Sequence, residues 1–138
     1  MRIEEHLVGF EKLGIFIHST LNKLPLKELQ KQSDELTELI LNSKNYNGWF
    51  TEENVKLSLE SIVKLLSVES LTNWANKYNL STIKKELKIG VIAAGNIPLV
   101  GFHDFLTVLI SGHSFYGKLS SDDNHLLRKL AEVLLVIE

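Results

Sequence analysis

The most constraining feature of the sequence is the stretch of residues 88–123, in which apolar runs alternate with turn signals. Residues 89–94 are a short apolar run that ends at a glycine, and their length and composition are typical of a strand buried on both faces of a parallel sheet. A Gly-Asn-Ile-Pro turn then leads into a buried helix predicted over residues 99–110, and residues 114–119 predict a second strand. A strand, a helix and a strand within about thirty residues indicate a βαβ unit.

Polar residues follow both predicted strands of this unit. Gly95 and Asn96 follow the first strand, and residues 118–121 span the end of the second strand and the start of the loop after it. Ligands of parallel sheets bind beyond the carboxyl ends of the strands, so we expect both loops to lie on one rim of the sheet. Residues 120–123 (Ser-Ser-Asp-Asp) also predict the cap of a final helix over residues 126–137.

Amphipathic helices are predicted before this unit. Apolar residues at steps of three and four indicate helices over residues 3–22, 26–42 and 52–66. A shorter helix is predicted to begin at Ser70 or Thr72, and residues 79–86 are expected to link it to the first strand.

Trp49 and Phe50 precede the third of these helices, and Thr51 is a suitable N-cap for it. Two interpretations of the aromatic pair remain open. The commoner one is that both rings pack in the core, because aromatic side chains dominate core energetics. The other is that they line a channel for an acyl chain.

Composition excludes several classes of protein. The sequence has no cysteine, which excludes disulfides and a Cys-ligated zinc site, and its five histidines have no ligand spacing, so no metal site is expected. A net charge of -2 gives no electrostatic footprint for nucleic acid. No apolar run approaches the length of a membrane span and no secretory signal pattern begins the chain, so we expect a cytoplasmic protein.

Two motifs point to a known family. Residues 95–99 read G-N-I-P-L, and residues 112–121 read G-H-S-F-Y-G-K-L-S-S. With the segment between them, they resemble the W-N-F-P-L turn and the G-N-x-V-x-x-K-P-S-E segment of the aldehyde dehydrogenase superfamily, with the same spacing from Gly to Lys. Leu119 departs from that pattern, where the family has proline. Residues 47–55 (NGWFTEENV) resemble the acyl-CoA reductase branch, kin of the long-chain fatty-acid reductase of bacterial bioluminescence, and the likeness extends over about residues 49–134.

The resemblance implies an α/β fold with an N-terminal α-helical region over residues 1–85. Residues 86–138 would then be the βαβ start of a doubly wound, aldehyde dehydrogenase-like dinucleotide-binding domain. The implied reaction is the reduction of a fatty acyl-CoA, or another acyl thioester, to an aldehyde. The family performs this reaction through a downstream cysteine, so the chain is expected to be the N-terminal portion of a longer enzyme and to be inactive alone.

The resemblance also implies the site residues. Asn96 matches the oxyanion-hole asparagine, and a carboxamide at a strand tip can donate an N–H to an oxyanion; alternatively, it only tolerates a turn conformation beside Gly95. Lys118 matches the lysine that contacts the adenosine ribose, although a lysine at a strand end is commonly just a solvated charge. Ser120, Ser121 and Gly95 complete the expected cofactor-binding set. Because Ser121 stands where many NAD-preferring relatives have glutamate, we expect NADPH, with NADH possible.

A different class of function remains open, namely a non-catalytic helical interaction protein that carries a βαβ unit. Two strands leave faces and edges of the sheet uncovered. We therefore expect the chain to form a homo-oligomer or to cover the sheet with its own helices. No nucleic acid partner and no membrane span are expected.

Overall fold

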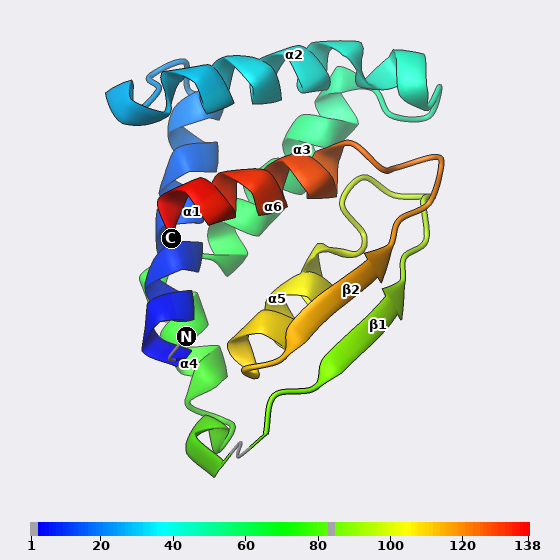
Figure 1. The fold of residues 1–138 in the computed structure, drawn as a ribbon. Coiled ribbons are helices and arrows are strands. Elements are labelled where there is room, and N and C mark those ends of the chain that lie inside the picture. The colour runs from blue at the N-terminus through cyan, green and yellow to red at the C-terminus, as the bar shows by residue number, and fades with distance from the viewer. Residues whose placement is uncertain (1–2, 83–84) are drawn as a thin grey trace.

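The computed structural model of this protein describes residues 3–82 and 85–138 (Figure 1). Over these residues it combines helices with a two-stranded parallel sheet, so the α/β class is confirmed at that level. The elements, in chain order, are α1 (Ile3–Leu21), the 3-10 helix η1 (Lys27–Leu29), α2 (Gln30–Tyr46), α3 (Glu52–Leu65), α4 (Val68–Ala75), the 3-10 helix η2 (Leu80–Thr82), β1 (Lys88–Ile92), α5 (Phe102–Ile110), β2 (Ser114–Lys118) and α6 (Leu126–Ile137).

The predicted helices over residues 3–22, 52–66 and 126–137 match α1, α3 and α6 within one residue at each end. The predicted cap of α3 is also confirmed. The Thr51 hydroxyl accepts a hydrogen bond from the Asn54 N–H at 3.1 Å, and so satisfies one of the free donors of the first turn.

Two predicted helix starts are wrong. The second helix, expected over residues 26–42, is η1 followed by α2, and α2 continues into the segment expected to be a loop. The fourth helix begins at Val68 rather than at Ser70 or Thr72, because the Ser67 hydroxyl accepts the Ser70 N–H at 3.2 Å and caps it earlier. The predicted linker that follows this helix includes η2, and its positions 83–84 lie outside the described residues.

The βαβ unit is confirmed, because β1 and β2 pair in parallel and α5 connects them. In this register Gly90 lies opposite Tyr116, and Ile92 lies opposite Lys118. The first strand is shorter than predicted and ends at Ile92, although the Ala93 N–H still donates to the Lys118 carbonyl at 3.0 Å.

The described chain covers one face of this sheet, so the prediction of a strand buried on both faces is wrong. α5 packs on the covered face (Figure 1), where the Phe105 and Phe115 rings meet edge to face with centroids 5.1 Å apart. On the open face Ile92 is 85% exposed and Tyr116 is 55% exposed. A Cβ added at Gly90 would meet nothing within 4 Å. Apolar side chains of β1 on the open face are therefore not covered by any described element.

The hydrophobic core lies between the helices and is centred on α1. The Phe10 ring is fully buried there and meets the rings of Phe102 and Phe105 edge to face, at centroid distances of 6.3 and 5.9 Å. Residues from both predicted regions, 1–85 and 86–138, thus contribute to one cluster of buried side chains. The division of the chain into these two regions stays a prediction.

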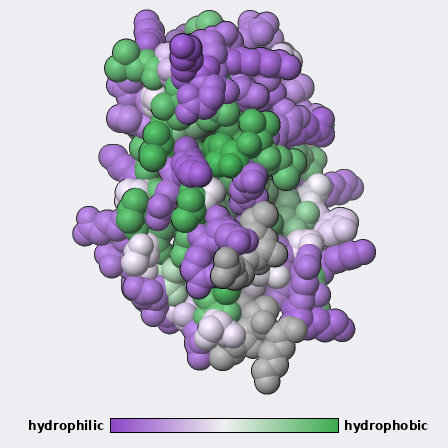
Figure 2. All heavy atoms as spheres, turned by 60° about the vertical axis from the view of Figure 1, so that its left-hand side comes forward, coloured by the Kyte–Doolittle hydropathy of each residue, from purple (hydrophilic) through white to green (hydrophobic). Residues whose placement is uncertain are grey.

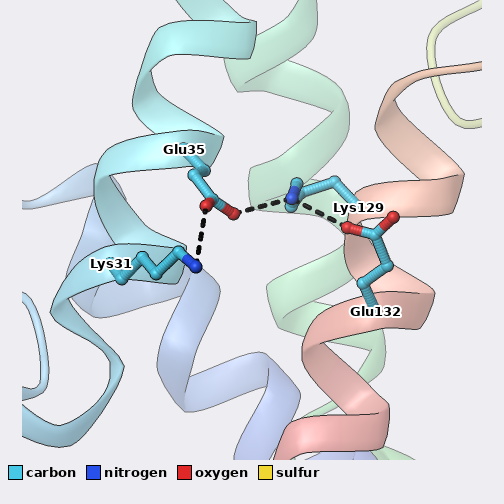
Figure 3. Close-up of polar contacts among 4 residues, drawn as sticks. All are labelled: Lys31, Glu35, Lys129 and Glu132. Atoms are coloured by element: carbon cyan, nitrogen blue, oxygen red, sulfur yellow. Dashed lines mark hydrogen bonds and ion pairs between the residues drawn. The ribbon is translucent and has the colours of Figure 1, made fainter.

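Charged side chains join α2 to α6 on the surface of this core (Figure 3). The Lys129 ammonium lies 2.7 Å from a Glu35 carboxylate oxygen and 2.8 Å from one of Glu132, and Lys31 lies 4.0 Å from Glu35. The hydrogen bonds to Glu132 and Glu35 raise the pKa of Lys129, and the bond from Lys129 lowers the pKa of Glu35. The Lys129–Glu35 ion pair therefore links α6 to α2 at the surface of the core.

Apolar side chains also reach the surface where α1 comes close to the end of α6. Figure 2 shows apolar atoms gathered on this face between charged side chains. An open hollow of about 350 Å³ lies there, and its apolar lining includes Ile15, Leu26, Val136 and Ile137. Ile15 and Val136 are each 56% exposed.

The central position of Phe10 generates a prediction about stability. Phe10→Ala should lower the free energy of unfolding by about 3–5 kcal/mol, because it removes the ring and leaves a cavity between α1 and α5. Urea denaturation followed by circular dichroism measures this change. Val8→Ala is the matched control on the same helix; Val8 is 47% exposed, and its substitution should change stability by less than about 0.5 kcal/mol. Equal effects of the two substitutions would contradict the assignment of the core.

Candidate functional site

The loops that follow the two strands lie on one edge of the sheet and touch each other. We call residues 93–101 the first rim loop and residues 119–125 the second rim loop. A Cβ built on Gly95 would lie 2.7 Å from the Ser120 Cβ and 3.0 Å from the Asp122 Cβ. Any side chain at position 95 would therefore push the loops apart, and glycine is required there by the close approach.

Asp123 joins the two rim loops through a buried hydrogen bond. Its Oδ2 accepts the Leu99 N–H at 2.9 Å, and the residue is only 9% exposed. Leu99 has a φ of 60°, a left-handed conformation that is uncommon for leucine, so the turn that holds it is constrained by its surroundings. Burial raises the pKa of the Asp123 carboxyl above its ordinary value, and the hydrogen bond from Leu99 lowers it in part.

Two sequence predictions for the residues around this hydrogen bond are wrong. Residues 120–123 do not cap α6: its N-cap position is His125, whose side chain makes no capping hydrogen bond. The helix predicted over residues 99–110 begins only at Phe102, because Leu99 belongs to the constrained turn before it. At the rim, Asp123 bonds across to Leu99 rather than capping the helix that follows it.

A third segment, residues 46–51, reaches the rim from the N-terminal helices. The Asn47 amide donates to the Gly95 carbonyl at 3.4 Å and to the Asp122 carbonyl at 3.2 Å, so it contacts both rim loops. Its Oδ1 accepts the Trp49 N–H at 3.0 Å. Sequence reasoning missed Asn47, although the residue begins the segment that resembles the acyl-CoA reductase branch. An amide offers two donors and an acceptor, which suits it to such a bridge.

The aromatic residues of this segment have different surroundings. Phe50 is 3% exposed and packs in the core, as the commoner interpretation predicts. Trp49 is 84% exposed, so that interpretation is wrong for the indole. The Tyr46 and His125 rings lie in contact with their planes tilted by 37° and their centroids 4.1 Å apart, which adds a contact between the end of α2 and the second rim loop.

The structure places all five predicted site residues on this rim. Gly95 and Ser120 are in contact, and the Ser120 hydroxyl accepts the Asp122 N–H at 3.2 Å, so Ser120 helps to shape its own loop. Asn96 and Ser121 are exposed on the first and second rim loops, and Lys118 is exposed at the end of β2. The roles of these residues in catalysis and cofactor binding stay predictions.

The rim presents exposed hydrogen-bond donors on loops whose backbone is held in place by hydrogen bonds. Within residues 3–82 and 85–138, no group of three or more His, Cys, Asp and Glu side chains is placed to hold a metal ion. In the same ranges, no helix is both long enough and apolar enough to cross a bilayer.

Comparisons with protein-family models, with curated proteins and with solved structures found no match to this chain.

The bridging role of Asn47 predicts a measurable effect. Asn47→Ala removes both donors to the rim loops and should lower the free energy of unfolding by about 1–2 kcal/mol. It should also speed hydrogen exchange of the Trp49 amide, which loses its acceptor. Asn45→Ala is the control, because Asn45 is exposed and its amide donates to the Asn42 side chain at 3.5 Å, within its own helix. Unchanged exchange at Trp49 would contradict the bridge.

The buried carboxyl of Asp123 predicts a dependence of stability on pH. Because its pKa is raised on folding, the folded state holds the proton over a pH range where the unfolded state has lost it. The contribution of Asp123 to the free energy of unfolding should therefore fall as the pH rises through the raised pKa. Asp123→Asn keeps an oxygen acceptor for the Leu99 N–H and should abolish this pH-dependent part of the stability between about pH 3 and 7. Thermal melts over that pH range measure the change.

Asp123→Ala tests the hydrogen bond itself. It leaves the Leu99 N–H without an acceptor and should cost about 1–3 kcal/mol at every pH in that range. If the Asn and Ala variants were equally stable, the hydrogen bond to Leu99 would not hold the rim loops together.

Proposed function

We propose that this chain forms the cofactor-facing and acyl-facing rim of an acyl-CoA reductase of the aldehyde dehydrogenase type. In this proposal β1, α5 and β2 begin a doubly wound nucleotide-binding sheet. The observation that carries it is the contact between the two rim loops at Gly95 and Ser120, beyond the carboxyl ends of two parallel strands. That is where sheets of this class bind dinucleotides.

Asn96 has the role of polarising the acyl oxygen. It is exposed next to Gly95, whose carbonyl is bonded to Asn47, so the carboxamide extends from a backbone that is held in place. A donor of this kind contributes about 2.7–4 kcal/mol to an acyl-transfer step when it faces the developing oxyanion. Because the donor is neutral, it requires no counter-charge in the free protein.

Lys118 and Ser121 have the role of holding the adenosine end of NADPH. Alternation along β2 places the Lys118 side chain on the open face of the sheet, beside Ile92 of β1, where a ligand can approach. The Ser121 hydroxyl can donate to a 2′-phosphate. Asp122 is exposed next to it; if that carboxylate faces the ribose instead, NADH will bind more tightly than NADPH.

The hydride would come from the cofactor, and the acyl group would be carried by a cysteine outside these 138 residues. The chain's own residues then bind and orient the two reactants. A cytoplasmic location is part of the proposal.

Titration calorimetry of the 138-residue chain with NADPH, and separately with NADH, tests the cofactor site. Lys118→Ala should weaken NADPH binding about tenfold, because a charge-assisted contact is lost. Lys88→Ala is the control, since Lys88 lies at the other end of the open face, near the Tyr116 ring. It should change the affinity less than about twofold. Absence of binding, or equal effects of the two substitutions, would refute the site.

A non-catalytic interaction protein is the second candidate function. The observation that favours it is the exposed apolar surface, both on the open sheet face and in the hollow between α1 and α6. A homo-oligomer could bury either surface. This alternative predicts no nucleotide binding in the same titration and a mass that rises with concentration in sedimentation.

A further inference from the structure

Asn47 is followed by Gly48, and no other asparagine of the sequence precedes a glycine. In such a pair the glycine nitrogen can attack the carboxamide carbon of the asparagine, because glycine has no side chain to hinder the approach. Gly48 is exposed, and a Cβ built on it would meet no atom of the described chain within 4 Å. The turn between α2 and α3 therefore has the residue types and the access to water that spontaneous deamidation requires (Figure 1).

The reaction is a cyclisation followed by hydrolysis. The Gly48 nitrogen loses its proton and bonds to Cγ of Asn47, while the bond from Cγ to Nδ2 breaks. Nδ2 takes up one proton and leaves as ammonia. Water then opens the succinimide ring at either of its carbonyls and leaves aspartate or isoaspartate at position 47. Water is the only co-reactant, and nothing is oxidised or reduced.

The folded rim holds Asn47 in a conformation that resists this cyclisation. Its ψ is 115°, which rotates the Gly48 nitrogen away from Cβ, so ring closure requires a rotation about the Cα–C bond. Three hydrogen bonds oppose that rotation: Nδ2 donates to the carbonyls of Gly95 and Asp122, and Oδ1 accepts the Trp49 N–H. The carboxamide is therefore protected while both rim loops contact it.

The contacts with the rim loops are weak enough to open. The hydrogen bonds from Asn47 to Gly95 and Asp122 are 3.4 and 3.2 Å long, at or beyond the upper end of the usual range for N–H···O bonds. Asn47 is half-buried, so water competes for both donors. Loops with few buried contacts open locally at a smaller cost in free energy than global unfolding. Each opening frees the carboxamide to meet the Gly48 nitrogen.

The product cannot restore the contact with the rim loops. An aspartate side chain accepts hydrogen bonds but donates none when it is ionised, so its oxygens would face the carbonyl oxygens of Gly95 and Asp122 with no proton between them. Isoaspartate also adds a methylene to the backbone, which displaces the turn that leads to the buried Phe50. Either product therefore separates the rim loops from the helical region.

We infer that the Asn47-Gly48 pair is a deamidation site governed by the rim. The closed rim protects the site, each opening exposes it, and its product keeps the rim loops apart from the turn after α2. The site thus converts a reversible opening of the loops into a permanent one. This inference stands on the contacts of Asn47 and does not depend on the proposed function.

Peptide mass mapping after incubation at mildly alkaline pH measures the rate at which Asn47 is converted. The rate should be at least about tenfold lower in the folded chain than in the chain unfolded in urea. Asp123→Ala removes the hydrogen bond between the rim loops and should raise the rate in the folded chain about tenfold. Gly48→Ala is the matched control, since its Cβ has room in the fold but hinders the attack. It should be converted slowly both in buffer and in urea.

Equal rates in the folded and the unfolded wild-type chain would overturn the inference, and so would an unchanged rate in folded Asp123→Ala. If circular dichroism shows that Asp123→Ala is unfolded, the wild-type chain in urea below its unfolding transition takes its place. The rate of conversion should then rise before the helical signal falls. A rate that follows only the helical signal would mean that global unfolding exposes the site, and would equally overturn the inference.

Asn47→Asp reproduces one product and tests the consequence of the modification. It keeps an oxygen acceptor for the Trp49 N–H but loses both donors to the rim loops. Hydrogen exchange of the Leu99 amide, which donates to Asp123, should therefore become about tenfold faster, while exchange of the Trp49 amide stays within about twofold of wild type. Unchanged exchange at Leu99 would show that the product leaves the rim closed, against the inference.

Discussion

The hydrogen bond from the Leu99 N–H to the buried Asp123 carboxylate is the interaction on which the rim depends. It joins the loop after β1 to the loop after β2, and it does so where both are withdrawn from water. A buried polar group that lost its partner there would keep its desolvation cost without compensation. The two loops therefore have one favourable arrangement, with Gly95 against Ser120.

The helical region contributes to the rim through side chains far away in the sequence. Asn47 bonds to both rim loops, and Phe50 connects the same turn to the core that Phe10 occupies on α1. The position of Asn96 is thus tied to the packing of helices that carry no proposed chemistry. Such support is what a binding site needs, because misplacement by about 1 Å lowers the contribution of a positioned donor.

Much of the fold could be predicted because its signals are local. Periodic apolar residues and the Thr51 cap located α1, α3 and α6, and the apolar runs around a turn indicated the βαβ unit. The juxtaposition of Gly95 and Ser120 followed from the general rule for parallel strands. The errors arose where a side chain bonds across the fold: the roles of Asp123 and Asn47 depend on partners 24 and 48 or more positions away. No local pattern marks such partners.

By itself, then, the sequence determined which segments become helix or strand, that the two strands run parallel, and that the chain has no thiol chemistry of its own. Only the tertiary structure decided that the sheet keeps an open face, that Phe50 is buried while Trp49 is exposed, and that Asn47 belongs to the rim. The physical reason is that periodicity records the average burial of an element. Which side chain meets which partner is settled by the packing of all the elements together.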